Sequence, residues 1–384
     1  MRTSLIAVAL ASLAAAAPLE KRWAYSKYWN VEGHRGARGE AIESTLPAFA
    51  QALVSGVTTL EFDFGVTRDN KVVVWHDETI QPEKCFDTAP AFENDPDFPY
   101  VNKSMNDLTL AQVKTLDCGS QRLTGFPLAF TVPGQKLSTL EELFDFVDCA
   151  TDEPVLFNIE SKINPEVEGA TKTPAEFMDV FLPILQARGD EFVDRVTHQS
   201  FDWRSIILSK KRLPSLRTSA LCDDTTIYAY PEGETTGNLT VHGEGAGKWL
   251  AGINIDDFEG ETIGERVARA AASIKADVLS PVATSYASPV ASADLEGWVP
   301  FVNSTMVDTA HELGIETHVW TPNTAAIWEY LLDIGVDGFI TDYPENVRRF
   351  FKAQYPELPL APKADELRVQ KCLIKHNQVH DISA

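Results

Sequence analysis

The run Val57-Thr58-Thr59-Leu60-Glu61-Phe62-Asp63 has the composition of a buried β-strand and ends in two carboxylates. Similar apolar runs stand just before His76 and Glu160. Polar side chains that end successive buried strands meet at the carboxyl edge of a parallel barrel. The recurrence therefore predicts an α/β fold, a TIM (β/α)8 barrel with its functional site at that edge.

Eight strand-like runs alternate with helical patterns, the order that builds a parallel sheet. The runs are 31–34, 59–63, 155–160, 195–200, 216–221, 276–280, 316–320 and 337–341. Amphipathic helices are expected at 45–53, 139–147, 174–188, 262–275, 304–313 and 324–332. Residues 71–76 follow the second strand after a short turn, so they should return antiparallel as a hairpin.

The chain of 384 residues suits one barrel with additions. Its first residues read as a secretory signal peptide, because Arg2 precedes an apolar stretch too short to span a bilayer. A long segment after His76 is rich in Pro and Asp and is expected to form an inserted cap. The expected divisions are 1–16 for the signal peptide (to 22 with a propeptide), 23–355 for the barrel, about 77–135 within it for the cap, and 356–384 for a C-terminal extension.

The leader predicts a secreted, extracellular glycoprotein, with glycosylation sequons at Asn102, Asn238 and Asn303. No apolar tail closes the sequence, so stable membrane insertion is not expected. The formal net charge of −23 argues against nucleic acid as a partner. A small-molecule substrate is expected instead, and the sequence does not name any protein partner.

Five cysteines follow the leader, and an oxidising route would allow two disulfide bonds. Cys85 with Cys118 is the favoured pair, since both fall within one irregular segment. Cys149 with Cys222 is the second expectation, which leaves Cys372 over.

Residues two apart on a strand share a face, so Glu61 and Asp63 should point into the barrel together, with Glu160 reaching the same space. Three carboxylates with room for water make a site of Mg²⁺ or Ca²⁺ type, whereas zinc more often recruits histidine. The ordinary alternative for such acids is a solvated edge strand. The apolar runs before both acid pairs count against it.

Hydrolysis beside such a cation needs a base for the attacking hydroxyl and an acid for the leaving oxygen. His34 and His76 are the expected pair, and the sequence does not tell which does which. Arg35 follows His34 and offers paired donors to phosphate oxygens, and Lys162 adds a second positive charge. Trp320 could form the bottom of a substrate pocket, although an inward-facing Trp more often packs in the hydrophobic core.

Three further polar residues, Glu43, Thr45 and Glu32, lie near the expected site, but the sequence does not assign them a catalytic role. Glu43 and Thr45 precede the first helix, where they either brace the site or cap the helix, and capping is favoured for Thr45. Glu32 shares a strand face with His34 and should point into the barrel, but no partner for it can be read.

Together these segments resemble the glycerophosphodiester phosphodiesterase family, which carries eight such motifs in this order over roughly residues 31–346. Eight motifs in register are far more specific than any single one. They stand here as His34-Arg35-Gly36, Glu43-Ser44-Thr45, Glu61-Phe62-Asp63, His76-Asp77, Glu160-Ser161-Lys162, Ser200-Phe201, Trp320-Thr321 and Thr341-Asp342.

The resemblance implies a barrel with an insertion after the His-Asp hairpin. One departure is Ser44, where the family usually has Asn, so a hydrogen bond near the site is either missing or re-made. The implied roles are a divalent metal on Glu61, Asp63 and Glu160, acid and base at His34 and His76, and phosphate binding by Arg35 and Lys162.

The sequence thus predicts a secreted, metal-dependent hydrolase that converts glycerophosphodiesters to glycerol 3-phosphate and an alcohol. Either water or the substrate's own neighbouring hydroxyl could attack. The alternative is a phospholipase D-like or cyclising lyase activity on lysophospholipids, with acyl chains received by the apolar segment 126–130. A second alternative is a non-catalytic secreted binding or cell-wall protein, against which the intact histidines and acids count.

Overall fold

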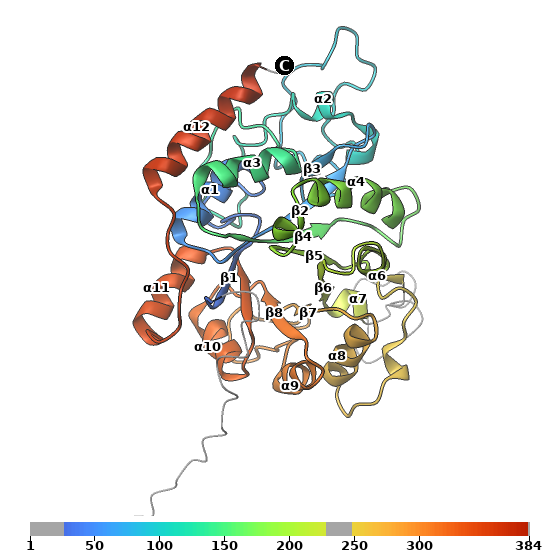
Figure 1. Cartoon of the computed structure of the whole chain (residues 1–384), viewed down its shortest axis with the longest axis vertical. Helices are drawn as coiled ribbons and strands as arrows, with labels where there is room; N and C mark the ends of the chain where they lie inside the picture. The colour runs from blue at the N-terminus through green and yellow to red at the C-terminus, as the bar shows by residue number, and fades with distance from the viewer. Residues whose placement is uncertain (1–26, 228–247, 383–384) are drawn as a thin grey trace, which may run out of the picture.

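The computed structural model describes residues 27–227 and 248–382, which build a closed barrel of eight parallel strands ringed by helices (Figure 1). Closure is seen at β1, which pairs with β2 on one side and β9 on the other. The predicted TIM barrel is therefore confirmed. The strands are β1 (Asn30–Gly33), β2 (Thr59–Val66), β3 (Val72–Val74), β4 (Leu156–Ser161), β5 (Val196–Ser200), β6 (Arg217–Cys222), β7 (Val278–Pro281), β8 (Glu316–Trp320) and β9 (Gly338–Thr341).

Every residue of strand β2 is buried. Its alternate side chains serve two purposes, one set packing in the core and the other entering the site. Phe62 faces outward and packs edge-on against Phe49 of the first helix, with ring centroids 5.5 Å apart. Burial of such a side chain contributes about 1.5–3 kcal/mol. The alternation of the strand then directs Glu61 and Asp63 into the barrel.

Helices link the strands on the outside of the barrel. Thr139 and Thr262 begin α3 and α8 with reciprocal hydrogen bonds to Glu142 and Glu265, which satisfy the free N–H groups of the first turn. Helices α6 and α11, whose sequences are largely polar, were not among the predicted helices. The helices are α1 (Leu46–Ser55), α2 (Leu110–Val113), α3 (Leu140–Ala150), α4 (Pro174–Ala187), α5 (Asp190–Val193), α6 (Trp203–Arg212), α7 (Asp224–Ile227), α8 (Ile263–Ser273), α9 (Ser304–Glu312), α10 (Ala325–Asp333), α11 (Pro344–Gln354) and α12 (Glu366–Ile382), with 3-10 turns η2 (Met105–Asp107) and η4 (Ile255–Asp257).

Strand β3 pairs antiparallel with β2, as the short turn between them predicted. The chain from there to α3 is mostly irregular and is fastened by the expected Cys85–Cys118 disulfide. Beside this bond Phe86 and Asp117 exchange two backbone hydrogen bonds of 2.8 and 3.0 Å. The residues on both sides of the disulfide are therefore held in one place.

The second disulfide corrects an expectation. Cys149 of α3 is bonded to Cys372 of α12, whereas Cys222 is a free and fully buried thiol at the end of β6. Figure 1 shows α12 lying along α3 and α1, so the C-terminal segment folds back onto the barrel exterior. The predicted Cys149–Cys222 pair was wrong because that packing brings Cys372 to Cys149.

Some sequence predictions lie outside the described residues: the signal peptide, the propeptide and the sequon at Asn238. The sequon residue Asn303 is described, and its side chain caps α9 by accepting a hydrogen bond from the Met306 N–H. Within the described ranges, no helix is both long and apolar enough to cross a membrane.

A polar network fills the barrel interior and supplies the partners that the sequence could not name for Glu32. Its Oε1 accepts a hydrogen bond from Asn30 Nδ2 at 2.8 Å and lies 2.8 Å from His318 Nδ1. Its Oε2 accepts from Asn158 Nδ2, also at 2.8 Å. The other His318 nitrogen lies 3.2 Å from Glu316 Oε2. Burial alone would lower the pKa of His318, but the bonds to Glu316 and Glu32 raise it to about 9.

The His318 network predicts a pH-dependent stability. Because the folded pKa of about 9 exceeds the unfolded value, the contribution is complete below about pH 6.5 and is lost as pH rises through 9. The free energy of unfolding should therefore fall by roughly 3 kcal/mol between pH 6 and pH 10 through this group. Urea unfolding at both pH values should show a smaller fall in His318→Gln, and equal falls in the two proteins would contradict the assignment.

Candidate active site

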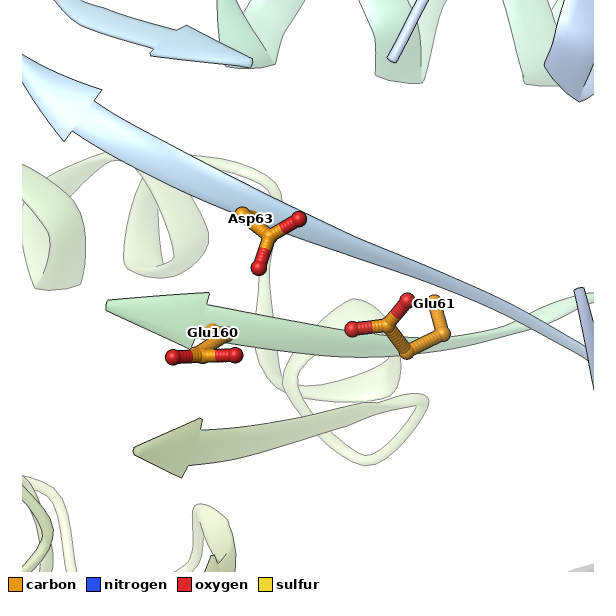
Figure 2. Close-up of side chains that lie close together, drawn as sticks. All are labelled: Glu61, Asp63 and Glu160. Carbon is orange, nitrogen blue, oxygen red and sulfur yellow. The ribbon is translucent and has the colours of Figure 1, made fainter. Parts of the chain in front are cut away.

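Three buried carboxylates converge at the carboxyl ends of β2 and β4. In the parallel register Asp63 stands opposite Glu160, and Glu61 lies two residues earlier on the same face. One oxygen from each of the three lies within 4.8 Å of the others. Figure 2 shows the three side chains lying close together at the neighbouring strands β2 and β4. The structure therefore brings together the expected metal ligands.

The electrostatics of this cluster favour a cation. Burial, and then the charges of Asp63 and Glu160, raise the pKa of Glu61 well above its ordinary value. Burial and the charge of Asp63 also raise the pKa of Glu160, to about 7, against the opposing effect of Lys162. Asp63 Oδ2 is buried, accepts no hydrogen bond, and lies 3.6 Å from Arg35 Nε. A divalent cation would give Asp63 Oδ2 a partner and would offset the repulsion that raises the pKa values of Glu61 and Glu160.

Glu61 is oriented through both of its oxygens. Gln199 Nε2 on β5 donates to Oε1 at 2.6 Å, and the Arg35 backbone N–H donates to Oε2 at 2.9 Å. The Gln199 amide oxygen in turn accepts a hydrogen bond from Asn158 at 3.0 Å. The polar interior of the barrel thus extends without a break from Glu32 to this carboxylate.

His34 follows β1 and is anchored by the end of β9. Its Nδ1 lies 2.6 Å from Asp342 Oδ1, and Asn323 donates to the second Asp342 oxygen at 2.7 Å. A carboxylate only accepts, so Nδ1 carries the proton and Nε2 is the basic atom. Burial lowers the pKa of His34, although Asp342 opposes that effect.

His76 follows β3 and is held from both sides. Its Nδ1 lies 2.9 Å from Asp77 Oδ1, and its Nε2 lies 3.3 Å from Lys162 Nζ. Because Asp77 accepts and Lys162 donates, both partners favour the tautomer with the proton on Nδ1. Burial, followed by the charges of Lys162 and Arg35, lowers the pKa of His76 well below its ordinary value. Its Nε2 is therefore unprotonated and carries the lone pair that a general base needs, with Lys162 as its present hydrogen-bond donor.

The two positive charges expected for phosphate binding flank the carboxylates. Lys162 Nζ lies 2.8 Å from Glu160 Oε1, and Arg35 donates to Glu43 Oε1 at 3.0 Å. The Arg35 turn needs the next residue to be Gly36, which has a φ of 89° and whose added Cβ would lie 2.7 Å from a backbone carbon of Ala48. Glycine thus brings the Arg35 loop against α1.

In the motif before α1, Glu43 takes the bracing role that was considered for it, whereas the side-chain cap favoured for Thr45 is not made. Glu43 braces the site, because it pairs with Arg35, Arg38 and Lys84. Thr45 occupies the N-cap position of α1 but makes no side-chain cap; its hydroxyl donates to the Ile42 carbonyl. Ser44 has a φ of 57°, a conformation that Asn tolerates better, and its buried hydroxyl has no hydrogen-bond partner. The hydrogen bond expected near the site is therefore missing.

Trp320 ends β8 and donates to the Ser280 carbonyl at 3.0 Å. Its ring meets that of Phe201 edge-on, with centroids 5.4 Å apart. The same Phe201 ring lies 5.7 Å from Lys162 Nζ. Trp320 therefore belongs to an aromatic wall that reaches Lys162.

Four supporting residues were not among the predicted site residues: Asp77, Lys84, Gln199 and Asp342. Asp77 and Asp342 stood within quoted motifs, and their place after a strand was the available signal. Gln199 is one polar residue within an ordinary strand. Lys84 stands in an irregular segment, and the sequence holds no signal for its role.

The eight motifs, the closed barrel and this geometry agree with comparison to known proteins. A model of the glycerophosphoryl diester phosphodiesterase family matches residues 34–346. The chain belongs to this family. The resemblance read from the motifs is confirmed, and the protein is a phosphodiesterase of this enzyme family.

Individual relatives give the same picture. Over 191 residues the chain is 29% identical to a glycerophosphodiester phosphodiesterase from Caldanaerobacter subterraneus, a match that spans 50% of this chain and 65% of the relative. A solved structure from Silicibacter pomeroyi with the same family description is 26% identical, with a TM-score of 0.63 over 87% of this chain and 97% of its own. A phosphodiesterase from Oleispira antarctica, solved with the product sn-glycerol-3-phosphate, shares the fold with a TM-score of 0.55, 17% identity, and coverage of 85% of this chain and 98% of its own.

Proposed function

We propose that this protein is a secreted, metal-dependent phosphodiesterase that hydrolyses glycerophosphodiesters to glycerol 3-phosphate and an alcohol. The observation that carries the proposal is one site in which three buried carboxylates stand beside two histidines with basic Nε2 atoms. A binding protein would have no need of this set. Family membership supplies the class of substrate.

Glu61, Asp63 and Glu160 are proposed to hold the divalent cation. Their all-oxygen donor set fits Mg²⁺ or Ca²⁺ better than zinc. A bound ion of this kind would polarise the phosphate and neutralise charge that develops on its oxygens. Lys162, 2.8 Å from Glu160, and Arg35, 3.6 Å from Asp63, are placed to hold phosphate oxygens beside that ion.

His34 and His76 are proposed as the acid and base. Each is anchored through Nδ1 by a carboxylate, so each presents Nε2 for proton transfer. One Nε2 would accept the proton of the attacking hydroxyl, and the other, once protonated, would give a proton to the leaving alkoxide. The aromatic wall of Trp320 and Phe201 is proposed to shield one side of the substrate.

Secretion is proposed from the leader sequence together with the two disulfide bonds. Disulfide bonds form and persist in oxidising compartments such as the secretory route. Edman sequencing of protein recovered from the culture medium of a eukaryotic host should begin at Ala17 or Trp23, and an intact leader on cell-retained protein would contradict the proposal.

The substrate is tested with a matched pair of phosphodiesters, glycerophosphocholine and lysophosphatidylcholine. We expect release of choline and glycerol 3-phosphate from the first, at a kcat/KM at least about tenfold above that for the second. The reverse order would assign a phospholipase D-like activity, and a cyclic phosphate product would assign a lyase. Turnover of neither substrate, in protein shown to bind Mg²⁺, would favour the non-catalytic reading.

A further inference from the structure

Lys84 lies in the mostly irregular segment between β3 and α3, called the insertion below. It connects this insertion to the active site in a way that the reaction itself does not explain. Its side chain is only 11% exposed, and its Nζ lies 5.5 Å from the centre of the Trp75 ring. It bonds two carboxylates at once, Glu43 Oε1 at 2.8 Å and Asp77 Oδ2 at closer range. A buried lysine that bridges two carboxylates fixes their separation.

Each of these carboxylates orients a residue proposed to act on the substrate. Glu43 accepts from Arg35, and Asp77 fixes the Nδ1 side of His76. Glu43 has two guanidinium partners besides Lys84, namely Arg35 and Arg38. For Asp77 the described contacts give one basic side chain other than His76, which is Lys84. The His76 side should therefore depend on Lys84 more strongly than the Arg35 side.

The backbone of Lys84 is held by the insertion. The next residue, Cys85, is bonded to Cys118, and Phe86 pairs with Asp117 through two backbone hydrogen bonds. Lys84 thus directly precedes an isolated antiparallel bridge that is cross-linked by a disulfide bond. Movement of this bridge would carry the Lys84 ammonium away from both carboxylates.

We propose that Lys84 is a positioning residue through which the disulfide-bonded insertion sets the orientation of His76 and, more weakly, of Arg35. The inference rests on the proposed function, because it assigns a role within that catalytic site. It gives the insertion a part in the reaction rate that is separate from any contact with the alcohol of the substrate.

The first test is kinetic. Lys84→Met keeps the stem against Trp75 and removes the charge, so kcat should fall about tenfold to a hundredfold, with KM changed by less than about threefold. Lys84→Arg should recover most of kcat. The matched control is Lys114→Met, which removes another lysine of the insertion that pairs with a carboxylate, Glu142, away from the site. A Lys84→Met kcat within about twofold of this control would overturn the proposal.

Combined substitutions distinguish a positioning role of Lys84 from a general loss of structure, because changes that act through one interaction do not add their losses in kcat. Asp77→Asn combined with Lys84→Met should be no slower than the slower single variant, because both changes act through one interaction. Cys85→Ser with Cys118→Ser should lower kcat in the wild-type background but add little to Lys84→Met. Fully multiplicative losses in both combinations would contradict transmission through Lys84.

The second test is independent of turnover. In protein labelled with ¹⁵N-histidine, the His76 ring should show the Nδ1-protonated tautomer in the wild type and in Lys114→Met, and a mixture of tautomers in Lys84→Met. If no phosphodiester is cleaved but these signals behave as stated, the proposed function fails and the positioning role stands. If the wild type is active and the His76 signals are the same in Lys84→Met, the positioning role fails and the proposed function stands.

Discussion

Replacement of His76 by alanine should lower kcat by about 10²–10⁴-fold, the usual loss when one acid or base is removed. The expectation follows from a ring anchored at Nδ1 by Asp77, with a basic Nε2 beside Lys162. His34→Ala should show a loss of the same order, since Asp342 anchors that ring in the same way. Steady-state kinetics with glycerophosphocholine would measure both.

The matched control is His311→Ala. His311 also pairs with a carboxylate, Asp337, at 2.7 Å, but it lies on α9, away from the strand ends that carry the site. Its kcat should stay within about threefold of the wild type. A folded His34 or His76 variant, checked by circular dichroism, that kept more than about a tenth of the wild-type rate would remove that residue from the mechanism.

Removal of the cation should abolish turnover. Three converging buried carboxylates repel one another even with Lys162 and Arg35 beside them, as the raised pKa values of Glu61 and Glu160 show. Asp63 Oδ2 has no hydrogen-bond donor. Dialysis against chelator should therefore reduce the rate by at least about a hundredfold, and either Mg²⁺ or Ca²⁺ should restore it. Calorimetric titration of the chelated protein should show a single binding site.

Asp63→Asn separates loss of metal from loss of fold. The variant keeps the shape of the side chain but lacks one negative charge, so cation affinity should fall at least about tenfold while the melting temperature changes little. Asp277→Asn, on the loop before β7, serves as the control and should bind the cation as the wild type does. Full activity in excess chelator, with no metal found by elemental analysis, would refute the site.

Local sequence pattern was enough to predict the barrel strands and the inward carboxylates. The two-residue period of a strand places Glu61 and Asp63 on one face, and the apolar run before them counts against an exposed edge strand. The turn between β2 and β3 was too short for a crossover helix, which fixed the antiparallel hairpin. These features depend on neighbours in the chain.

The features that were missed depend on contacts between distant segments. Glu32 found its partner in His318, and Cys149 bonded with Cys372 because α12 folds back over α3. Lys84 lies in a segment with no hydrophobic period, so no local rule could bring its ammonium between Glu43 and Asp77. Such pairings follow from the closed barrel and were not readable before it.

Phosphorus NMR of the purified full chain with glycerophosphocholine and Mg²⁺ tests the central claim most directly. The phosphodiester signal should be replaced by one phosphomonoester signal, that of glycerol 3-phosphate. The conversion should stop when chelator is added and resume when Mg²⁺ is returned. A phosphodiester signal that persists with the metal present, or a conversion that continues unchanged in chelator, would contradict a metal-dependent glycerophosphodiesterase.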